Sequence, residues 1–308
     1  MNTVLNGTSL DRLYPNVLEA LLTHGEDIAP RGMKTKELRG ATIHLQGAEH
    51  NIIRCPVRKL NYGFGCAEAI WMLAGMNDVE TVNAVNKNIA AFSDNGRTFY
   101  GSYGPMLADQ LPYVIGTLQS DPSSRQAVIS IWRPRPGLTK DVPCTVSMQF
   151  FIRKNAVQMH VHMRSNDVWL GLPYDIFNFT TIQHMVAAEL GLAVGSYTHH
   201  VGSLHIYEKH YAVARESIEA AHSGTTAVSY WYPSFEKGDW CVPARVRAEF
   251  SAMIAVKTGN MPDLAVKIMR ESTWENTMSR GYKLMLDAIA SKLKIGEAQL
   301  PSIYHVRA

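Results

Sequence analysis

The chain has 308 residues, of which 46% are hydrophobic and 19% are charged. This balance is ordinary for a globular protein, and it excludes a disordered, collagen-like or coiled-coil chain. The formal charge of +3 suits a small anionic ligand but falls short of the dense basic patch of a nucleic-acid-binding protein. No apolar run is long enough to cross a bilayer. Residues 1–16 lack the pattern of a signal peptide, so we expect a cytoplasmic protein.

The expected elements alternate irregularly between helix and strand. Apolar residues recur at helical spacing over 9–24, 66–75, 105–119 and 174–190, and the tail over 262–294 is mainly helical. Residues 121–124 form a turn, and strand-like segments cover 127–132, 144–152, 157–164, 203–207 and 226–232. We interpret the charged cluster at 34–39 as a solvated surface segment. Clustered strands flanked by helices predict an α+β fold, and the lack of linker-like composition favours one domain over 1–308.

The alternation over 157–164 predicts a strand with one buried face and one polar face, which bears His160, His162 and Arg164. We assign His160 and His162 no role.

Cys144 is a candidate nucleophile. The four cysteines, Cys55, Cys66, Cys144 and Cys241, form no CxxC pair and no zinc spacing, which predicts reduced thiols and no metal site. Cys144 follows a proline at the start of a predicted strand, where its sulfur would face a pocket. On this ground alone the better interpretation is a small buried hydrophobe.

Three arginines strengthen the case for Cys144. Arg31, Arg125 and Arg164 lie in loop or strand-end contexts, where guanidinium groups would bind a phosphate and favour the thiolate. For any one of them singly, a surface ion pair is the simpler interpretation.

Several short segments, in order, resemble the thymidylate synthase and deoxycytidylate hydroxymethylase family, closer to the hydroxymethylase branch. The resemblance covers about residues 25 to 215. The segments are Glu-Ala-Ile-Trp at 68–71, Phe-Tyr-Gly at 99–101, Asp-Pro-Ser-Ser-Arg at 121–125, Pro-Cys-Thr at 143–145 with Gln-Phe at 149–150, Met-Arg-Ser-Asn-Asp-Val at 163–168, Leu-Gly-Leu-Pro-Tyr-Asp at 170–175, and Gly-Ser-Leu-His-Ile-Tyr at 202–207 with His210 beyond.

The resemblance implies a mixed β-sheet flanked by helices and packed in a homodimer. It also implies 5,10-methylenetetrahydrofolate as co-substrate, no metal, and a pyrimidine nucleoside monophosphate as substrate. The implied catalytic residues are Cys144 as nucleophile at C6, Glu68 for protons and water around the base, Tyr100 for the C5 proton, and Asp175. The implied substrate-binding residues are Arg31, Arg125 (reaching into the partner's site), Arg164 and Ser165 for the phosphate, with His205 and Tyr207 for the 3′-hydroxyl. Asp167, Gly171 and Trp71 would contact the folate. Without the resemblance, the simpler interpretation of Glu68 is an acidic residue on a helix surface, and that of His205 is a core histidine with its hydrogen bonds made.

Asp175 indicates which base is bound. Thymidylate synthases carry Asn at this position, and one amide answers both N3–H and O4 of uracil. A carboxylate accepts from the 4-amino group of cytosine and repels O4 of uracil. Asp175 therefore favours dCMP or CMP, although an aspartate is also a common helix N-cap.

Two further departures favour a hydroxymethyl product. The segment 87–92 lacks the tryptophans of the methylases, and residues 304–308 do not match the methylase C-terminus. A site more open to water favours water over hydride as the group that adds to the methylene intermediate on C5. Gln126 replaces a second arginine that is usual in the family, so the choice between ribose and deoxyribose stays open. Ser165 favours deoxyribose. The alternatives are a methylase acting on dUMP or a cytidylate, and an inactive nucleotide- or RNA-binding relative.

Overall fold

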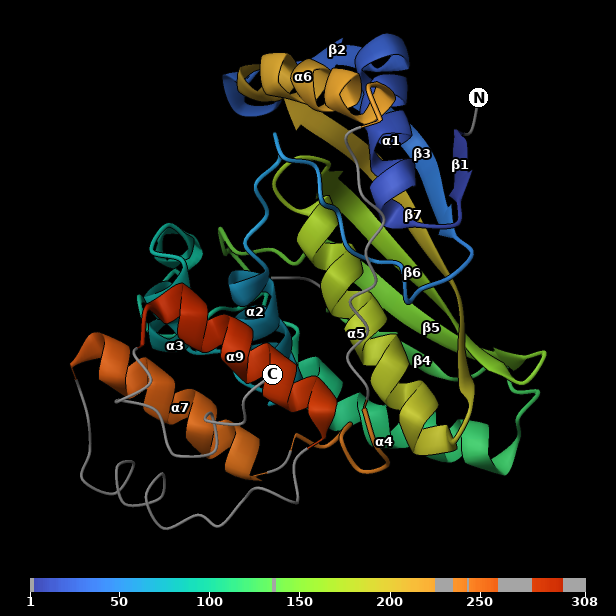
Figure 1. Cartoon of the computed structure of the whole chain (residues 1–308), viewed down its shortest axis with the longest axis vertical. Coiled ribbons are helices and arrows are strands. Elements are labelled where there is room, and N and C mark those ends of the chain that lie inside the picture. Colours follow the sequence, from blue (N-terminus) through green and yellow to red (C-terminus); the bar gives the residue numbers. More distant parts are fainter. Residues whose placement is uncertain (1–2, 135–136, 225–234, 243, 260–278, 296–308) are drawn as a thin grey trace. The chain divides into compact units, whose positions relative to one another are not determined.

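A computed structural model describes residues 3–134, 137–224, 235–242, 244–259 and 279–295 (Figure 1). The chain divides into two compact units. The first contains residues 1–60, 112–135 and 143–232, and the second contains residues 61–111, 136–142 and 233–308. The single catalytic domain over 1–308 stays a prediction.

The first unit is built on a mixed seven-stranded sheet, which confirms the predicted α+β class. Its order is β1-β3-β7-β6-β5-β4, with β2 paired to β3. The pairs β1–β3 and β6–β7 are parallel, and the other pairs are antiparallel. The strands are β1 (Val4–Gly7), β2 (Glu26–Ile28), β3 (Thr35–Leu45), β4 (Val128–Ser130), β5 (Thr145–Arg153), β6 (Ala156–Asp167) and β7 (Ala193–Tyr207).

Helix α5 (Leu172–Leu190) covers one face of this sheet and contacts β6 and β7 (Figure 1). Proline in its first turn suits a helix start, and Gly191 ends it with a left-handed φ of 67°. The face beneath it carries the buried side chains of β6, namely Val157, Met159, Val161 and Met163. The period-2 pattern of the sequence thus places the core on one side of β6 and polar residues on the other.

Helices α1 (Leu10–His24) and α6 (Tyr211–His222) contact each other, and α1 also contacts β1, β3 and β7 (Figure 1). The buried hydroxyl of Tyr14 donates to the carbonyl of Val168 at 3.1 Å. This bond ties α1 to the turn between β6 and α5, where the predicted site residues are concentrated.

The second unit is helical in its described part. It contains α2 (Tyr62–Leu73), α3 (Val79–Val85), α7 (Ala244–Thr258) and α9 (Arg280–Leu293), and α2 contacts α9 and α3. A Cβ on Gly63 would lie 2.5 Å from the carbonyl oxygen of Ala288, so glycine permits the close approach of α2 to α9. Helix α4 (Gly104–Ser120) begins in this unit and ends in the first.

Most of the predicted elements are present with shifted ends. The helices expected over 9–24, 105–119 and 174–190 correspond to α1, α4 and α5, while α2 begins earlier than the predicted 66. The turn at 121–124 forms, since Ser124 N–H donates to the carbonyl of Asp121 at 3.0 Å. The strand expected over 203–207 is the end of the longer β7, and α9 lies within the helical tail. The segments 226–232 and 262–278 lie outside the described residues.

The charged cluster at 34–39 begins β3, a strand that the sequence did not predict. Lys34 and Arg39 are exposed, as expected of a solvated surface segment, whereas the uncharged Thr35 and Leu38 are buried. Within the described residues, no helix has the length and apolar character that a membrane span requires. The homodimer stays a prediction.

Candidate active site

The predicted site residues fall in both units. The first unit holds Arg31, Arg125, Cys144, Arg164, Ser165, Asp167, Gly171, Asp175, His205 and Tyr207, and the second holds Glu68, Trp71 and Tyr100.

Cys144 and Arg164 meet at the pairing of β5 with β6. The backbone N–H of Arg164 donates to the carbonyl of Cys144 at 2.9 Å. The side-chain Nε donates to the carbonyl of Pro143 at 2.9 Å, and Nη2 donates to the Cys144 Sγ at 3.7 Å. The guanidinium also lies 6.0 Å from the ring centroid of Trp132. This geometry holds a permanent cation beside the thiol, and a nearby cation favours the nucleophilic thiolate.

Arg31 lies in a short loop with an unusual backbone. Its φ and ψ of 54° and 30° are left-handed, a conformation that costs a non-glycine residue about 1 kcal/mol or more. Its side chain is exposed. Strain of this kind persists where the surrounding structure enforces it, and it is often found at binding loops.

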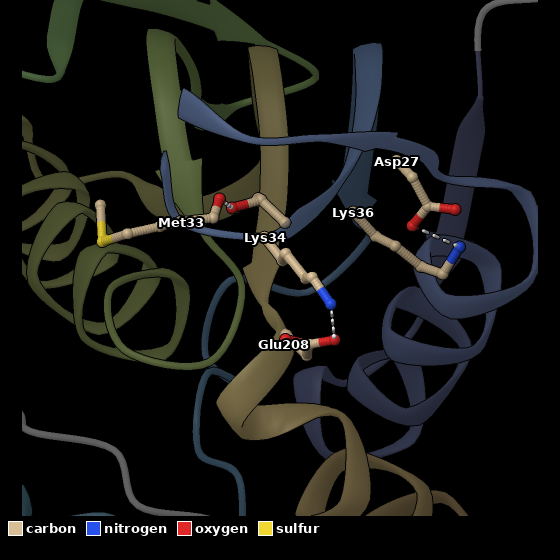
Figure 2. A network of polar contacts seen from close by, with 6 residues as sticks. Asp27, Met33, Lys34, Lys36 and Glu208 are labelled. Carbon is tan, nitrogen blue, oxygen red and sulfur yellow. Dashed lines mark hydrogen bonds and ion pairs between the residues drawn. The ribbon is translucent and has the colours of Figure 1, made fainter. Parts of the chain in front are cut away.

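Two ion pairs lie beside the strand that follows the Arg31 loop (Figure 2). Lys36 Nζ lies 3.1 Å from Asp27 Oδ1, and Lys34 Nζ lies 3.4 Å from Glu208 Oε1. In addition, the backbone N–H of Glu208 donates to the carbonyl of Lys34 at 3.0 Å. The start of β3 is thereby fastened to the end of β7, which carries His205 and Tyr207.

The end of β7 brings its two predicted residues next to other site residues. Tyr207 pairs in register with Thr35, and His205 pairs with Glu37 on one side and Asp167 on the other. The rings of His205 and Tyr207 meet edge to face, with centroids 5.4 Å apart.

Asp167 organises the turn from β6 into α5. Its Oδ1 accepts from the backbone N–H groups of Trp169 at 2.8 Å and Leu170 at 3.0 Å. Its Oδ2 is buried and has no hydrogen-bond partner within the described part of the chain. Arg58, which the sequence interpretation missed, donates from Nε and Nη2 to the carbonyl of Trp169 at 3.0 and 2.8 Å.

Asp175 lies in the first turn of α5, enclosed by protein but with some exposed area. Its Oδ2 accepts a hydrogen bond of 2.7 Å from Nδ2 of Asn166. Burial raises the pKa of this carboxyl to about 7, the Asn166 bond opposes the rise, and the like charge of Asp167 adds to it. The side chain can therefore exist as carboxylate or carboxylic acid near neutrality.

Gly171 makes this bond possible. A Cβ at this position would lie 3.0 Å from both Asn166 Nδ2 and Asp175 Oδ2. The family resemblance implied that Gly171 contacts the folate. In the structure, the close approach comes from two side chains of the protein itself.

Asn166 connects further into the core. Its Oδ1 lies 2.9 Å from His199 Nε2, and His199 Nδ1 lies 2.6 Å from the hydroxyl of Tyr197. Sequence interpretation missed all three residues. Strict alternation from Val157 would place Asn166 on the polar face with Arg164, so its burial could not be read from the pattern.

Arg125 and Ser165 occupy more open positions. Arg125 is exposed on the turn before β4, and its carbonyl accepts from Gln149 Nε2 at 2.9 Å. Ser165 is half-buried on β6, where it pairs in register with Ser203 of β7.

The three predicted residues of the second unit serve its own packing at least in part. Trp71 is buried on α2, donates from Nε1 to Asp78 Oδ2 at 3.2 Å, and meets Phe99 edge to face at 6.0 Å. Glu68 is half-buried on the same helix, and Tyr100 follows Phe99. Their catalytic and folate-binding roles stay predictions. In the described ranges, no group of three or more His, Cys, Asp or Glu residues is placed to hold a metal ion.

Comparison with known proteins identifies the family. The family model described as thymidylate synthase matches residues 12–230. The deoxyuridylate hydroxymethyltransferase of Bacillus phage SP01 is 33% identical over 238 residues, which cover 70% of this chain and 62% of that protein. The enzyme of the same name from Pseudomonas phage M6 is 33% identical over 178 residues, or 54% of this chain and 50% of that protein. The chain thus matches less than two thirds of the length of either relative.

A solved structure shows the same fold. Thermostable thymidylate synthase A from Bacillus subtilis superposes with a TM-score of 0.62 at 22% identity, covering 69% of this chain and 84% of that one. The family match runs from within α1 past α6 and includes the positions of Cys144, Arg164 and Asp175. The chain therefore belongs to the thymidylate synthase family.

Proposed function

We propose that this protein is a cytidylate 5-hydroxymethyltransferase. It would transfer the one-carbon unit of 5,10-methylenetetrahydrofolate to C5 of dCMP or CMP, and water would complete the hydroxymethyl group. The observation that carries the choice of base is the Asp175 carboxyl, which a hydrogen bond from Asn166 holds at the start of α5. A carboxylate accepts from the 4-amino group of cytosine and is repelled by O4 of uracil.

The Cys144–Arg164 pair supports covalent catalysis. The thiolate of Cys144 adds to C6 of the base, and the electron pair of the C5–C6 double bond makes C5 nucleophilic. Bound methylenetetrahydrofolate supplies the one-carbon unit that C5 attacks. Loss of the C5 proton to Tyr100 would then expel tetrahydrofolate and leave a methylene group on C5. Water would add to this methylene group, and re-formation of the C5–C6 double bond would expel the Cys144 thiolate. Glu68 orders water around the base.

The arginines support binding of a 5′-phosphate. Arg164 lies beside Cys144, and Arg31 projects from a strained loop next to the end of β7. Arg125 is exposed on its turn, and in a homodimer it would reach the partner's phosphate site. Ser165 would add a hydroxyl to this site. His205 and Tyr207, at the end of β7, would bind the 3′-hydroxyl of the sugar.

The residues near the turn after β6 fit a reduced folate. Asp167 Oδ2 is buried without a partner among the described residues, while Oδ1 is occupied by two backbone donors. A buried acceptor of this kind needs a donor, and a pterin N–H is one. Gly171 and Trp71 would complete the contact with the folate.

A second candidate is hydroxymethylation of a uridylate. The two phage relatives carry the name deoxyuridylate hydroxymethyltransferase. The pKa of Asp175, raised by burial to about 7, adds a physical route. A protonated carboxyl donates to O4 and accepts from N3–H, as the amide of asparagine does. The protonated form gains population as the pH falls, so uridylate turnover by this route would increase below pH 7.

Product mass tests both candidates. The enzyme and methylenetetrahydrofolate are incubated separately with CMP, dCMP and dUMP. A gain of CH2O on a cytidylate, faster than on dUMP, supports the proposal. A gain of CH2O on dUMP alone selects the second candidate. A gain of CH2 identifies a methylase and overturns both. No product from any of the three points to a nucleotide- or RNA-binding relative. Cys144→Ala is the control, and unchanged turnover in that variant would refute the covalent mechanism.

A further inference from the structure

We propose that Asn166, His199 and Tyr197 form a buried positioning relay that holds Asp175 as a hydrogen-bond acceptor and so tunes the choice between cytosine and uracil. The inference rests on the proposed role of Asp175 in base recognition. It adds three residues that do not themselves contact the substrate.

The relay is a continuous chain of hydrogen bonds inside the core. Tyr197 O–H to His199 Nδ1 measures 2.6 Å, His199 Nε2 to Asn166 Oδ1 measures 2.9 Å, and Asn166 Nδ2 to Asp175 Oδ2 measures 2.7 Å. Tyr197 and His199 have no exposed surface, and Asn166 is 3% exposed. The chain therefore runs from the buried face of β7, through β6, to Asp175, the one member of the four that is not buried.

The chemistry of the groups fixes the direction of the chain. When Asp175 is ionised its carboxylate only accepts, so the amide atom that faces it must be the NH2 group of Asn166. Oδ1 of Asn166 then faces His199, and the imidazole must donate from Nε2. Its Nδ1 is left as an acceptor for the Tyr197 hydroxyl. Burial, followed by the neighbouring His200 and His162, lowers the pKa of His199 to about 3, so the ring is neutral, as a donor–acceptor link requires.

This direction has a consequence for the substrate. The donor from Asn166 occupies Oδ2 and stabilises the ionised carboxyl, which leaves Oδ1 as an acceptor for the base. If the relay is cut at Tyr197, the imidazole loses the group that fixes its tautomer, and the Asn166 amide is free to reverse. A reversed amide presents an oxygen to Asp175, favours the protonated carboxyl, and creates the donor that O4 of uracil accepts.

Other charged and titratable groups near Asp175 do not replace the relay. Asp167 on β6 is a like charge that favours the protonated acid. From β7 the facing groups are Tyr197 and His199, which are members of the chain. On the α5 side, the Arg58 guanidinium lies 5.9 Å from the ring centroid of Tyr174. Arg58 donates its hydrogen bonds from Nε and Nη2 to the carbonyl of Trp169. Asn166 is the one side-chain donor to Asp175 in the hydrogen bonds of the described residues.

Two variants test the relay against a matched control. Tyr197→Phe removes one buried hydroxyl and keeps the ring, and Asn166→Leu removes the donor to Asp175. Tyr282→Phe is the control, since Tyr282 is also fully buried but donates to the backbone carbonyl of Asp239 in the second unit. The ratio of kcat/KM for dCMP to that for dUMP is measured for each. We expect it to fall about tenfold in both relay variants, the equivalent of one lost buried hydrogen bond, and to stay unchanged in Tyr282→Phe.

A second readout separates positioning from general damage. With dCMP as substrate, the acid limb of the kcat/KM profile should move to higher pH in Asn166→Leu, because Asp175 loses the donor that favours its ionised form. A carboxyl titration of Asp175 followed by NMR should move in the same direction without any turnover. An unchanged base ratio together with an unmoved titration would overturn the relay. If the parent enzyme turns over none of the nucleotides while the titration still moves, the relay stands and the proposed function fails.

Discussion

Two consecutive histidines on β7 show how differently the two faces of the sheet treat the same side chain. His199 lies on the face that α5 covers and has no exposed surface. Both of its ring nitrogens form hydrogen bonds. His200 points to the other face, where its ring stacks on His162 at 4.6 Å and its Nδ1 lies 3.2 Å from Thr42 Oγ1. We call this second surface, with His160, His162, His200 and Thr42, the histidine face.

Burial lowers the pKa of both rings, to about 3 for His199 and about 4 for His200, and neighbouring imidazoles add to both shifts. The hydrogen bonds differ, because both ring nitrogens of His199 bond to buried side chains, whereas His200 is only half-buried and lies among other imidazoles. His199 is thus held between Tyr197 and Asn166 in a chain of hydrogen bonds. The histidine face instead holds several imidazoles that oppose one another's protonation. Two neighbouring residues of one strand can therefore have different surroundings: one imidazole is held in a buried hydrogen-bonded chain, and the next lies in a cluster of imidazoles on the opposite face.

The largest expected effect is on the helix-covered side, at Asp175, where the hydrogen-bonded chain from Tyr197 through His199 and Asn166 ends. Asp175→Asn keeps an oxygen for Asn166 and turns an NH2 group towards the base. We expect the ratio of kcat/KM for dCMP to that for dUMP to fall on the order of a hundredfold, because the site then lacks an acceptor for the cytosine amino group. Steady-state kinetics on both nucleotides measures this change. An unchanged ratio would remove Asp175 from base recognition.

The next effect compares the two histidines directly in unfolding experiments. His199→Leu leaves Asn166 Oδ1 and the Tyr197 hydroxyl buried without their partner. We expect it to lower the free energy of unfolding by about 2–4 kcal/mol. His200→Leu, on the more open face, should cost about 1 kcal/mol or less. Urea denaturation of the two variants gives the difference, and equal losses would contradict the division between the faces.

A smaller effect concerns pH and the histidine face. The folded-state pKa of His200 is depressed, so the unfolded chain binds the proton first as the pH falls. Its contribution to stability is present above about pH 6.5 and is lost as the pH falls towards 4. His200→Gln should weaken the acid decline by on the order of 1 kcal/mol, since the group is half-exposed. Thermal unfolding between pH 4.5 and 7.5, with Lys34→Ala as a surface control, measures it. Parallel curves for parent and His200→Gln would assign the decline to other groups.

The smallest effect belongs to an exposed ion pair at the start of β3. Lys34 and Glu208 are 74% and 56% exposed, and their atoms are 3.4 Å apart. Lys34→Ala should change the free energy of unfolding by about 0.5 kcal/mol or less, and less still in high salt. Urea titrations at two salt concentrations check this. A loss comparable to that of His199→Leu would mean that this fastening of β3 to β7 contributes as much as the core.

The same contrast explains what the sequence predicted. Alternation over 157–164 was enough to place His160 and His162 on the polar face of β6, because one face must be apolar. No such pattern distinguished His199 from His200, since the segment before 203 mixes histidines with small residues and was not predicted as a strand. The start of β3 was missed because its lysines resemble a solvated surface. Those charges are in fact paired with Asp27 and Glu208.

Prediction of the candidate site had a similar limit. Family segments located Cys144, Arg164 and Asp175, and the structure places Arg164 against the thiol. The relay could not be predicted, because Asn166 and His199 are 33 residues apart and only the parallel pairing of β6 with β7 brings them together. The role of Gly171 could not be predicted either, since the atoms it makes room for belong to the side chains of Asn166 and Asp175.

The strand order also determines when β3 can pair fully during protein synthesis. β3 lies between β1 and β7, and its pairs with β7 run from Thr35–Tyr207 to Leu45–Tyr197. While the chain emerges from the ribosome, β3 therefore has an open edge until residues more than 150 positions later have been made. An unpaired edge of this kind is a template for wrong partners. The N-terminal hairpin of β2 and β3 therefore depends on the timely arrival of β7, and nascent chains halted before that strand should be the species that chaperones bind most.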